Sequence, residues 1–140
     1  MAAPVDVSII IPVLNKLEFT AQCLDRIWRN TDPGITYEVV VVDNASSDGT
    51  QAWFADPSRF PRPVQYLRNS TNRGFGPANN QGVRQSTGRY LLFLNNDTLV
   101  QAGWLSEMLK IVRDDESVGI VGIKQLRPGA DTGARAGGPA

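Results

Sequence analysis

Two aspartates stand where apolar runs of the sequence end, and both could do chemistry. Asp43 follows four consecutive valines at residues 39–42, and Asp97 follows the run at residues 90–94 after two asparagines. A carboxylate in such a place can accept hydrogen bonds from a ribose or a base, or it can bind a hard divalent cation together with amide oxygens. Each aspartate could instead cap the helix or turn that comes next. The residue types alone leave both roles open.

A glycine-bearing loop is the third chemical feature. Residues 57–96 contain six arginines and no Asp or Glu, so this part of the chain is locally basic. Arg73, Gly74 and Gly76 precede a predicted helix, and helix N-termini favour anions. We expect most of these arginines on a solvated face and assign Arg73 alone to an anionic ligand. The glycines also suggest a dinucleotide fingerprint, although Asn79 replaces its third glycine and the loop follows the third predicted strand.

Composition excludes several classes of function. The 140 residues include no His and one Cys, which removes Ser-His-Asp and Cys-His nucleophiles and histidine metal sites. The 14 Lys plus Arg balance the 14 Asp plus Glu, so we expect no nucleic-acid partner. No apolar run approaches the ~20 residues of a transmembrane helix. Cys23 is predicted to be a reduced core thiol, which favours a cytoplasmic location.

The two aspartates and the glycine-bearing loop are positioned by a series of apolar or β-branched runs. Successive runs start 26–32 residues apart. They lie at residues 5–12, 37–43, 64–67, 90–95 and 118–123. This spacing is typical of βαβ units and predicts an α/β domain with a mostly parallel sheet flanked by helices. Ligands of such sheets bind at the carboxyl ends of the strands, where the chemical residues above are found.

Helices are predicted between the strands. We expect them from residue 17 to about 28, at residues 50–55, after Pro77, and from about residue 103 to 113. Asn15 with Glu18 suggests a capping box for the first helix, Asp48 a cap for the second, and Gly88 a left-handed end of the third. Apolar periodicity stops near residue 127. We therefore expect a core at residues 1–126 and a Gly/Pro-rich loop or disordered tail at residues 127–140.

Four ordered segments carry a resemblance to a known family. They lie at residues 7–15, 39–50, 72–82 and 87–97, and the similarity extends from residue 5 to about 126. The chain resembles the N-terminal, nucleotide-sugar-binding portion of family 2 glycosyltransferases with the GT-A fold, and its loop variants are similar to those of rhamnosyltransferases. The resemblance implies a Rossmann-like but incomplete domain.

The resemblance also implies roles for individual residues. The residues around the nucleotide sugar would be Pro12, Val13, Asn15, Asp43, Arg73, Asn79, Asn95 and Asn96. Of these, Asp43 would hold the base or ribose, and Arg73 with Asn79 would close the nucleotide pocket. Asp97 would be the metal ligand for Mg²⁺ or Mn²⁺ on the donor diphosphate. Asn95 stands where the family has the first carboxylate of its Asp-x-Asp motif.

The implied function is transfer of a sugar from a nucleotide-diphosphate sugar to an acceptor hydroxyl on a saccharide or lipid-linked saccharide, in cell-surface polysaccharide synthesis. Such a transfer needs a carboxylate base, and none can be assigned in this sequence. A nucleotide-binding half-domain that needs a C-terminal portion or partner chain, and a dinucleotide-dependent oxidoreductase, are the alternatives. We also expect Trp104 or a strand at residues 118–123 to be partly uncovered, which would promote self-association.

Overall fold

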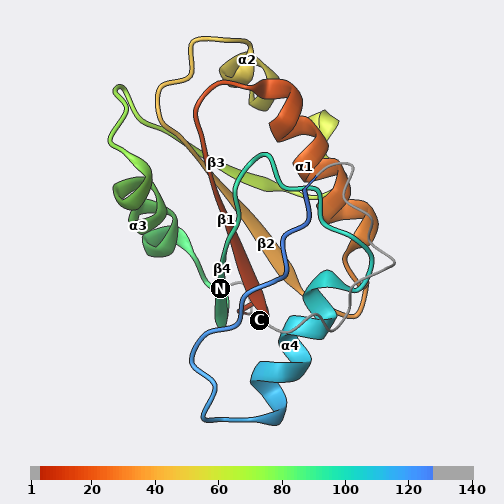
Figure 1. Ribbon diagram of the computed structural model, residues 1–140. Helices are drawn as coiled ribbons and strands as arrows, with labels where there is room; N and C mark the ends of the chain where they lie inside the picture. The colour runs from red at the N-terminus through yellow and green to blue at the C-terminus, as the bar shows by residue number, and fades with distance from the viewer. Residues whose placement is uncertain (1–3, 128–140) are drawn as a thin grey trace. The chain divides into compact units, whose positions relative to one another are not determined.

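The computed structural model describes residues 4–127, which contain one four-stranded sheet and its helices (Figure 1). The elements in chain order are β1 (Val7–Val13), α1 (Leu17–Asn30), β2 (Tyr37–Asp43), α2 (Thr50–Phe54), the 3-10 helix η1 (Pro57–Arg59), β3 (Val64–Arg68), α3 (Phe75–Gln85), β4 (Tyr90–Phe93) and α4 (Trp104–Asp114). The chain divides into two compact units, Met1–Ser106 and Glu107–Ala140. The whole sheet belongs to the first unit.

The sheet is parallel throughout and has the strand order β3-β2-β1-β4. Every residue of β1 is buried, and so are the last five residues of β2, because these strands are central and both faces are covered. In Figure 1 the strands run between α1 and α3. The expectation of a mostly parallel α/β sheet is confirmed, and β2 has the predicted bounds.

Two glycines allow the backbone to pack closely in the first unit. A Cβ at Gly82 of α3 would lie 2.4 Å from the Ile10 side chain of β1, so only glycine brings α3 down onto the sheet. A Cβ at Gly88 would lie 2.4 Å from the backbone N of Ser8. The prediction that Gly88 is a left-handed helix end is wrong, because its φ is not positive and α3 ends earlier, at Gln85, with Ser86 as its C-cap residue.

The start of α1 differs from the predicted capping box. Lys16, with φ 56°, is the N-cap residue, and no side chain of its own caps the helix. The Leu17 N–H instead donates to Asp48 Oδ2 at 3.1 Å, from the turn that follows β2. Asn15 is drawn to that same turn, where its Oδ1 accepts the Ser47 N–H. A partner distant in sequence therefore replaces the local cap.

The segment after α4, in the second unit, also differs from expectation. Residues 118–123 form no strand, and Ile120 is 93% exposed. This run contains two glycines and pairs with no strand among the described residues, so its β-branched residues gain nothing from a sheet. Most of the predicted tail at residues 127–140 lies outside the described residues. The sequence predicted that either Trp104 or residues 118–123 would be partly uncovered. Trp104 is buried in the first unit and donates to Thr31 Oγ1, whereas Ile120 and Ile123 are exposed, so the second alternative holds, although the segment is not a strand.

Candidate functional site

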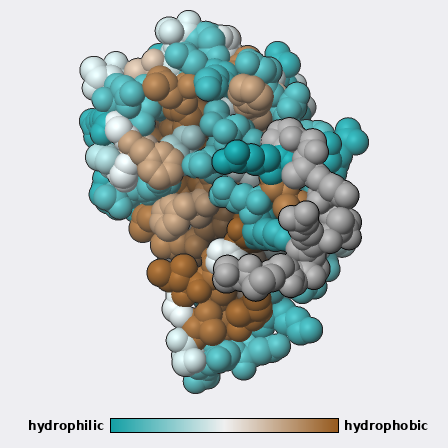
Figure 2. All heavy atoms as spheres, in the orientation of Figure 1, coloured by the Kyte–Doolittle hydropathy of each residue, from teal (hydrophilic) through white to brown (hydrophobic). Residues whose placement is uncertain are grey.

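The parallel strands bring four polar segments to one edge of the sheet. Strands β1, β2, β3 and β4 end at Val13, Asp43, Arg68 and Phe93, and each is followed directly by a loop or turn. The upper part of the face in Figure 2, around α2 of Figure 1, is largely hydrophilic with a few apolar side chains among the polar ones. The sequence-predicted site residues thus lie at or after the carboxyl ends of the strands of one sheet, in which β1 and β2 are central and β3 and β4 are the outer strands.

Asp43 is completely buried, with 0% exposure, and both oxygens of its carboxylate accept hydrogen bonds from the protein itself. Oδ1 accepts the Ser46 N–H at 2.8 Å. Oδ2 accepts both the Tyr66 hydroxyl and Arg68 Nη1, the latter at 2.9 Å. Burial and the neighbouring Asp43 carboxylate raise the pKa of Tyr66, which keeps that hydroxyl a donor. Asp43 therefore anchors the ends of β2 and β3 to each other.

Arg68 covers the Asp43 carboxylate and is a site residue that sequence reasoning left on the solvated face. Its Nη2 donates to the Ser46 carbonyl at 3.0 Å while Nη1 pairs with Asp43, and its side chain is 29% exposed. A guanidinium carries five N–H donors, so three remain for a ligand or water. Its position at the end of an apolar run was the only sequence signal.

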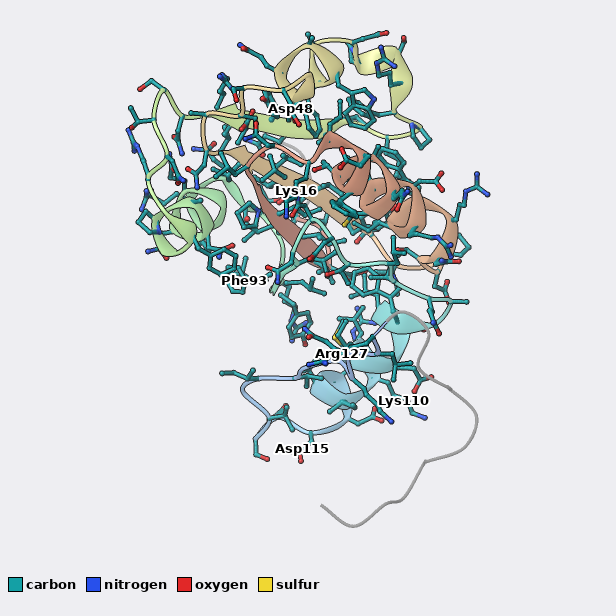
Figure 3. The ribbon with its side chains drawn as sticks, turned by 45° about the horizontal axis from the view of Figure 1, so that its top comes forward. Lys16, Asp48, Phe93, Lys110, Asp115 and Arg127 are labelled. Carbon is teal, nitrogen blue, oxygen red and sulfur yellow. The ribbon has the colours of Figure 1, made fainter. Side chains whose placement is uncertain are left out.

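The turns after β1 and β2 are joined by hydrogen bonds. Asn15 Oδ1 accepts the N–H groups of Ser47 and Asp48 at 2.7 and 3.2 Å, and the Asn15 N–H donates to Ser46 Oγ. Hydrogen bonds from the Thr50 hydroxyl, Thr50 N–H and Leu17 N–H hold the pKa of Asp48 below its ordinary value. Figure 3 labels Asp48 and Lys16 in these two turns. Asp48 therefore accepts the first N–H group of both α1 and α2, although the N-cap residue of α2 is Gly49 and not the predicted Asp48.

Pro12 and Val13 contribute to this edge through the backbone. Both residues are buried in β1, so their side chains belong to the core. The Val13 carbonyl accepts the Asn44 N–H at 2.9 Å, which continues the pairing of β1 with β2 beyond the last residue of β2. Asn44 was not expected at the site, and neither were Asn69 and Gln81, to which it is connected through side-chain amides.

Arg73 and Asn79, which the sequence placed together, have different surroundings. Residues 70–77 are all exposed, and Gly74 has φ 89°, a conformation that glycine adopts without strain. Arg73 forms no ion pair within residues 4–127. Asn79 lies on the buried side of α3 with 9% exposure, and its Oδ1 has no hydrogen-bond partner among the described residues. A buried orphan acceptor of this kind is uncommon.

The end of β4 is the least constrained part of the edge. Asn96 Nδ2 donates to Thr20 Oγ1 at 3.1 Å, whereas Asn95 and Asp97 are exposed. The Thr98 N–H is accepted by the Asn95 carbonyl, and no hydrogen bond or ion pair within the described part of the chain uses the Asp97 carboxylate. The alternative that Asp97 is merely a cap therefore finds no support in these contacts.

The end of β4 supplies few protein ligands for a hard divalent cation. No group of three or more His, Cys, Asp or Glu side chains is assembled anywhere in residues 4–127. Magnesium in proteins commonly uses one or two carboxylates with waters and substrate phosphates, so Asp97 with a neighbouring amide oxygen is a sufficient protein contribution.

Cys23 is the buried core thiol expected from the sequence. Burial and then the Asp97 charge raise the pKa of Cys23 to about 12.

Comparison with known proteins defines the class to which this fold and edge belong. Residues 8–136 match the model of the family described as "Glycosyl transferase family 2". The chain belongs to this family. The match favours the glycosyltransferase interpretation over the dinucleotide-dependent oxidoreductase, and it confirms the resemblance found in the sequence.

Individual relatives agree with the family. The glycosyltransferase AglE of Haloferax volcanii is 38% identical over 99 residues, covering 71% of this chain and 33% of that protein. The poly(ribitol-phosphate) beta-glucosyltransferase of Bacillus spizizenii is 26% identical over 112 residues, covering 79% of this chain and 18% of that protein. The chain thus spans a third or less of the length of these two relatives.

A solved structure confirms the fold. The mannosyltransferase PcManGT from Pyrobaculum calidifontis, in complex with GDP-Man and Mn²⁺, superposes with a TM-score of 0.75 at 29% identity. The superposition covers 84% of this chain and 34% of the mannosyltransferase. The parallel sheet with flanking helices is therefore the GT-A, Rossmann-like arrangement expected, and it matches part of the longer chain of that neighbour.

Proposed function

We propose that this chain is the donor-binding portion of a glycosyltransferase that moves a sugar from a nucleoside-diphosphate sugar to an acceptor hydroxyl. The observation that carries the proposal is the contrast among charged groups at the carboxyl edge. Asp43 and Arg68 satisfy each other, whereas Arg73 and Asp97 have no ion-pair partner within the described residues. One free cationic and one free anionic side chain fit a diphosphate with its counter-cation.

The chemistry of the donor explains why both groups are needed. Cleavage of a glycosyl-diphosphate bond leaves charge on the departing diphosphate. A bound Mg²⁺ or Mn²⁺ supplies charge stabilisation for that leaving group. Asp97, with an amide oxygen of Asn95 or Asn96, would hold the cation, and the Arg73 guanidinium would bind phosphate oxygens directly. The Mn²⁺ in the mannosyltransferase neighbour supports this assignment.

The nucleoside would occupy the segment between the ends of β1 and β3. Pro12, Val13 and Asn15 form its border from β1, and Asn79 would offer its orphan Oδ1 to a ligand donor. Asp43 contributes indirectly, because its carboxylate is sealed and the exposed group above it is the Arg68 guanidinium. The direct Asp43 contact expected from the sequence would require Arg68 or Tyr66 to move.

The reaction also needs an acceptor and a base. An acceptor hydroxyl must lose a proton to a base, and we assign that role to no residue of this chain. The proposed acceptor is a saccharide or lipid-linked saccharide of a cell-surface polymer, which the poly(ribitol-phosphate) relative supports.

The proposed site of action is the cytoplasm. No helix in the described part of the chain is long and apolar enough to cross a bilayer.

We propose that the chain binds its donor without efficient transfer, because transfer also requires a positioned and deprotonated acceptor.

A thermal-shift screen tests the proposed function. Purified protein is heated with UDP-GlcNAc, GDP-Man or NAD, each with Mn²⁺ and with a chelator instead of Mn²⁺. A nucleotide sugar should raise the melting temperature with Mn²⁺ and much less with chelator, since a ligand that binds only the folded state stabilises it by mass action. Two results would overturn the proposal: a melting temperature that rises with NAD but with no nucleotide sugar, or one that rises with no member of a broad panel of nucleotide sugars.

A further inference from the structure

Three side-chain amides connect the ends of β2 and β3 to α3. Asn69 Nδ2 donates to Asn44 Oδ1 at 2.9 Å and to Gln81 Oε1 at 2.7 Å, and Gln81 Nε2 returns a bond to Asn69 Oδ1 at 2.8 Å. Asn44 and Asn69 are buried directly after their strands, and Gln81 belongs to α3. We call these three residues the amide chain.

The amide chain ends on the loop that carries Arg73. Asn44 Oδ1 accepts the Arg73 N–H at 3.3 Å, and Asn44 Nδ2 donates to the Gly74 carbonyl at 3.1 Å. A single buried side chain therefore holds backbone groups of two consecutive residues in an otherwise exposed loop. The loop has one further side-chain bond of its own, from the Gly74 N–H to Asn72 Oδ1.

The hydrogen-bond capacity of these amides fixes their orientation. A side-chain amide oxygen has two acceptor sites and its nitrogen two donors. Asn44 Oδ1 uses both acceptor sites, for Asn69 and Arg73, and Asn69 Nδ2 uses both donors, for Asn44 and Gln81. Reversing the Asn44 amide would set its NH₂ group against two other donors. The loop backbone therefore bonds to one acceptor, Asn44 Oδ1, and one donor, Asn44 Nδ2, whose positions are fixed.

We propose that Asn44 is a positioning residue, which through the amide chain fixes the backbone of Arg73 and Gly74 and so presets the Arg73 side chain for the donor diphosphate. This inference rests on the proposed function for its ligand, although the loop contact itself does not. Arranging a flexible arginine before the ligand arrives lowers the ordering cost of binding. Asn44 acts through Arg73 and touches no ligand itself.

The test separates binding of the diphosphate from binding of the nucleoside. Calorimetry with Mn²⁺ compares UDP with uridine and GDP with guanosine for the parent, Asn44→Ala, Arg73→Ala and the double variant. Asn44→Ala should weaken binding of whichever nucleoside diphosphate binds the parent more tightly by about tenfold, and it should leave binding of the matching nucleoside nearly unchanged. Arg73→Ala should have the same effect. The double variant should lose little more than either single variant, because both changes remove one interaction.

Helix α3, which carries Gln81 of the amide chain, also offers a matched control variant. Gln85→Ala removes an exposed amide–amide contact between β3 and α3, from Gln65 Nε2 to Gln85 Oε1, without touching the loop. It should bind UDP and GDP as the parent does. If Asn44→Ala does not fold, Asn44→Leu serves in its place: it has a similar size and branching, and it removes both the acceptor of the Arg73 N–H and the donor to the Gly74 carbonyl.

Amide exchange makes failure of the inference distinguishable from failure of the proposed function. The Arg73 N–H should exchange faster in Asn44→Ala than in the parent and Gln85→Ala, with no ligand present. A parent protein that binds no nucleoside diphosphate would overturn the proposed function and the diphosphate role together, whatever the exchange result. Unchanged Arg73 exchange, equal losses for nucleoside and diphosphate, or additive losses in the double variant would overturn the inference alone.

Discussion

The two halves of the carboxyl edge of the sheet are constructed differently. At the ends of β1, β2 and β3, buried polar side chains bond to one another, as Asp43 does with Arg68 and Asn44 with Asn69. At the end of β4 the Asp97 carboxylate is exposed and takes part in no ion pair within residues 4–127. The first half is preorganised by the protein, and the second half leaves a charge for a ligand to satisfy.

This difference teaches which residues should matter for stability and which for binding. A buried ionised group is tolerated only when partners compensate for the loss of water, so removing a partner in the first half should destabilise the fold. An exposed carboxylate without partners contributes little to folding. Substitutions of the Asp43–Arg68 pair and of Asp97 should therefore separate stability from affinity.

The largest effect is expected for Arg68→Met. It leaves the Asp43 carboxylate buried without its cation, which should lower the free energy of unfolding by about 3 kcal/mol, the lower end for a broken buried pair because Arg68 is partly exposed. Urea denaturation at neutral pH measures the loss. Arg29→Met is the matched control, since the Arg29–Asp25 pair is exposed and should cost less than about 1 kcal/mol. Equal losses in both variants would erase the proposed difference between the two halves.

Asp43→Asn should also act on stability first. The amide keeps the size of the side chain but turns one oxygen into a donor that faces the donors of Ser46, Tyr66 or Arg68. The expected cost is about 1.5 to 3 kcal/mol, the range for hydrogen bonds to a charged group. Denaturation and nucleotide titration on the same preparation decide the question left open by the sequence. Weakened nucleotide binding with unchanged stability would show that Asp43 contacts the nucleoside directly.

Asp97→Ala should produce the reverse pattern. Its carboxylate supports no described contact, so stability should stay within about 0.5 kcal/mol of the parent. The Mn²⁺-dependent part of nucleotide-sugar affinity should fall by about tenfold, equivalent to about 1.4 kcal/mol. Titrations with Mn²⁺ and with chelator measure that part separately. A variant that binds as tightly as the parent in Mn²⁺ would remove Asp97 from the metal site.

The smallest effect is expected for Asp48→Ala, which removes the shared cap of α1 and α2 and should cost about 1 kcal/mol at neutral pH. Hydrogen bonds hold the folded-state pKa of Asp48 below its ordinary value of 3.8. The stabilisation is therefore present above that value and is lost as pH falls through the lower folded-state pKa. Denaturation at several pH values should show parent and variant converging in acid. A gap that persists below this pKa would mean that the neutral carboxyl caps equally well.

Much of the fold follows from the sequence because its signals are local. The consecutive valines of β2 and the spacing of the runs predicted parallel strands, and the polar residues after them predicted the edge at which ligands would bind. The run at residues 118–123 carried the same kind of signal and formed no strand. A β-branched run is a strand only when a neighbour pairs with it, and composition does not supply that neighbour.

The sequence by itself determined the four strands of the parallel sheet and the placing of Asp43, Arg73 and Asp97 at or after the carboxyl ends of β2, β3 and β4. Only the tertiary structure decided that Asp43 is sealed beneath Arg68 and that Asn44 holds the loop of Arg73. These partners stand 25 and 29 residues apart in the chain. Periodic patterns specify what each segment becomes, whereas such pairs form because β2 and β3 are neighbours in the sheet and α3 packs against β2.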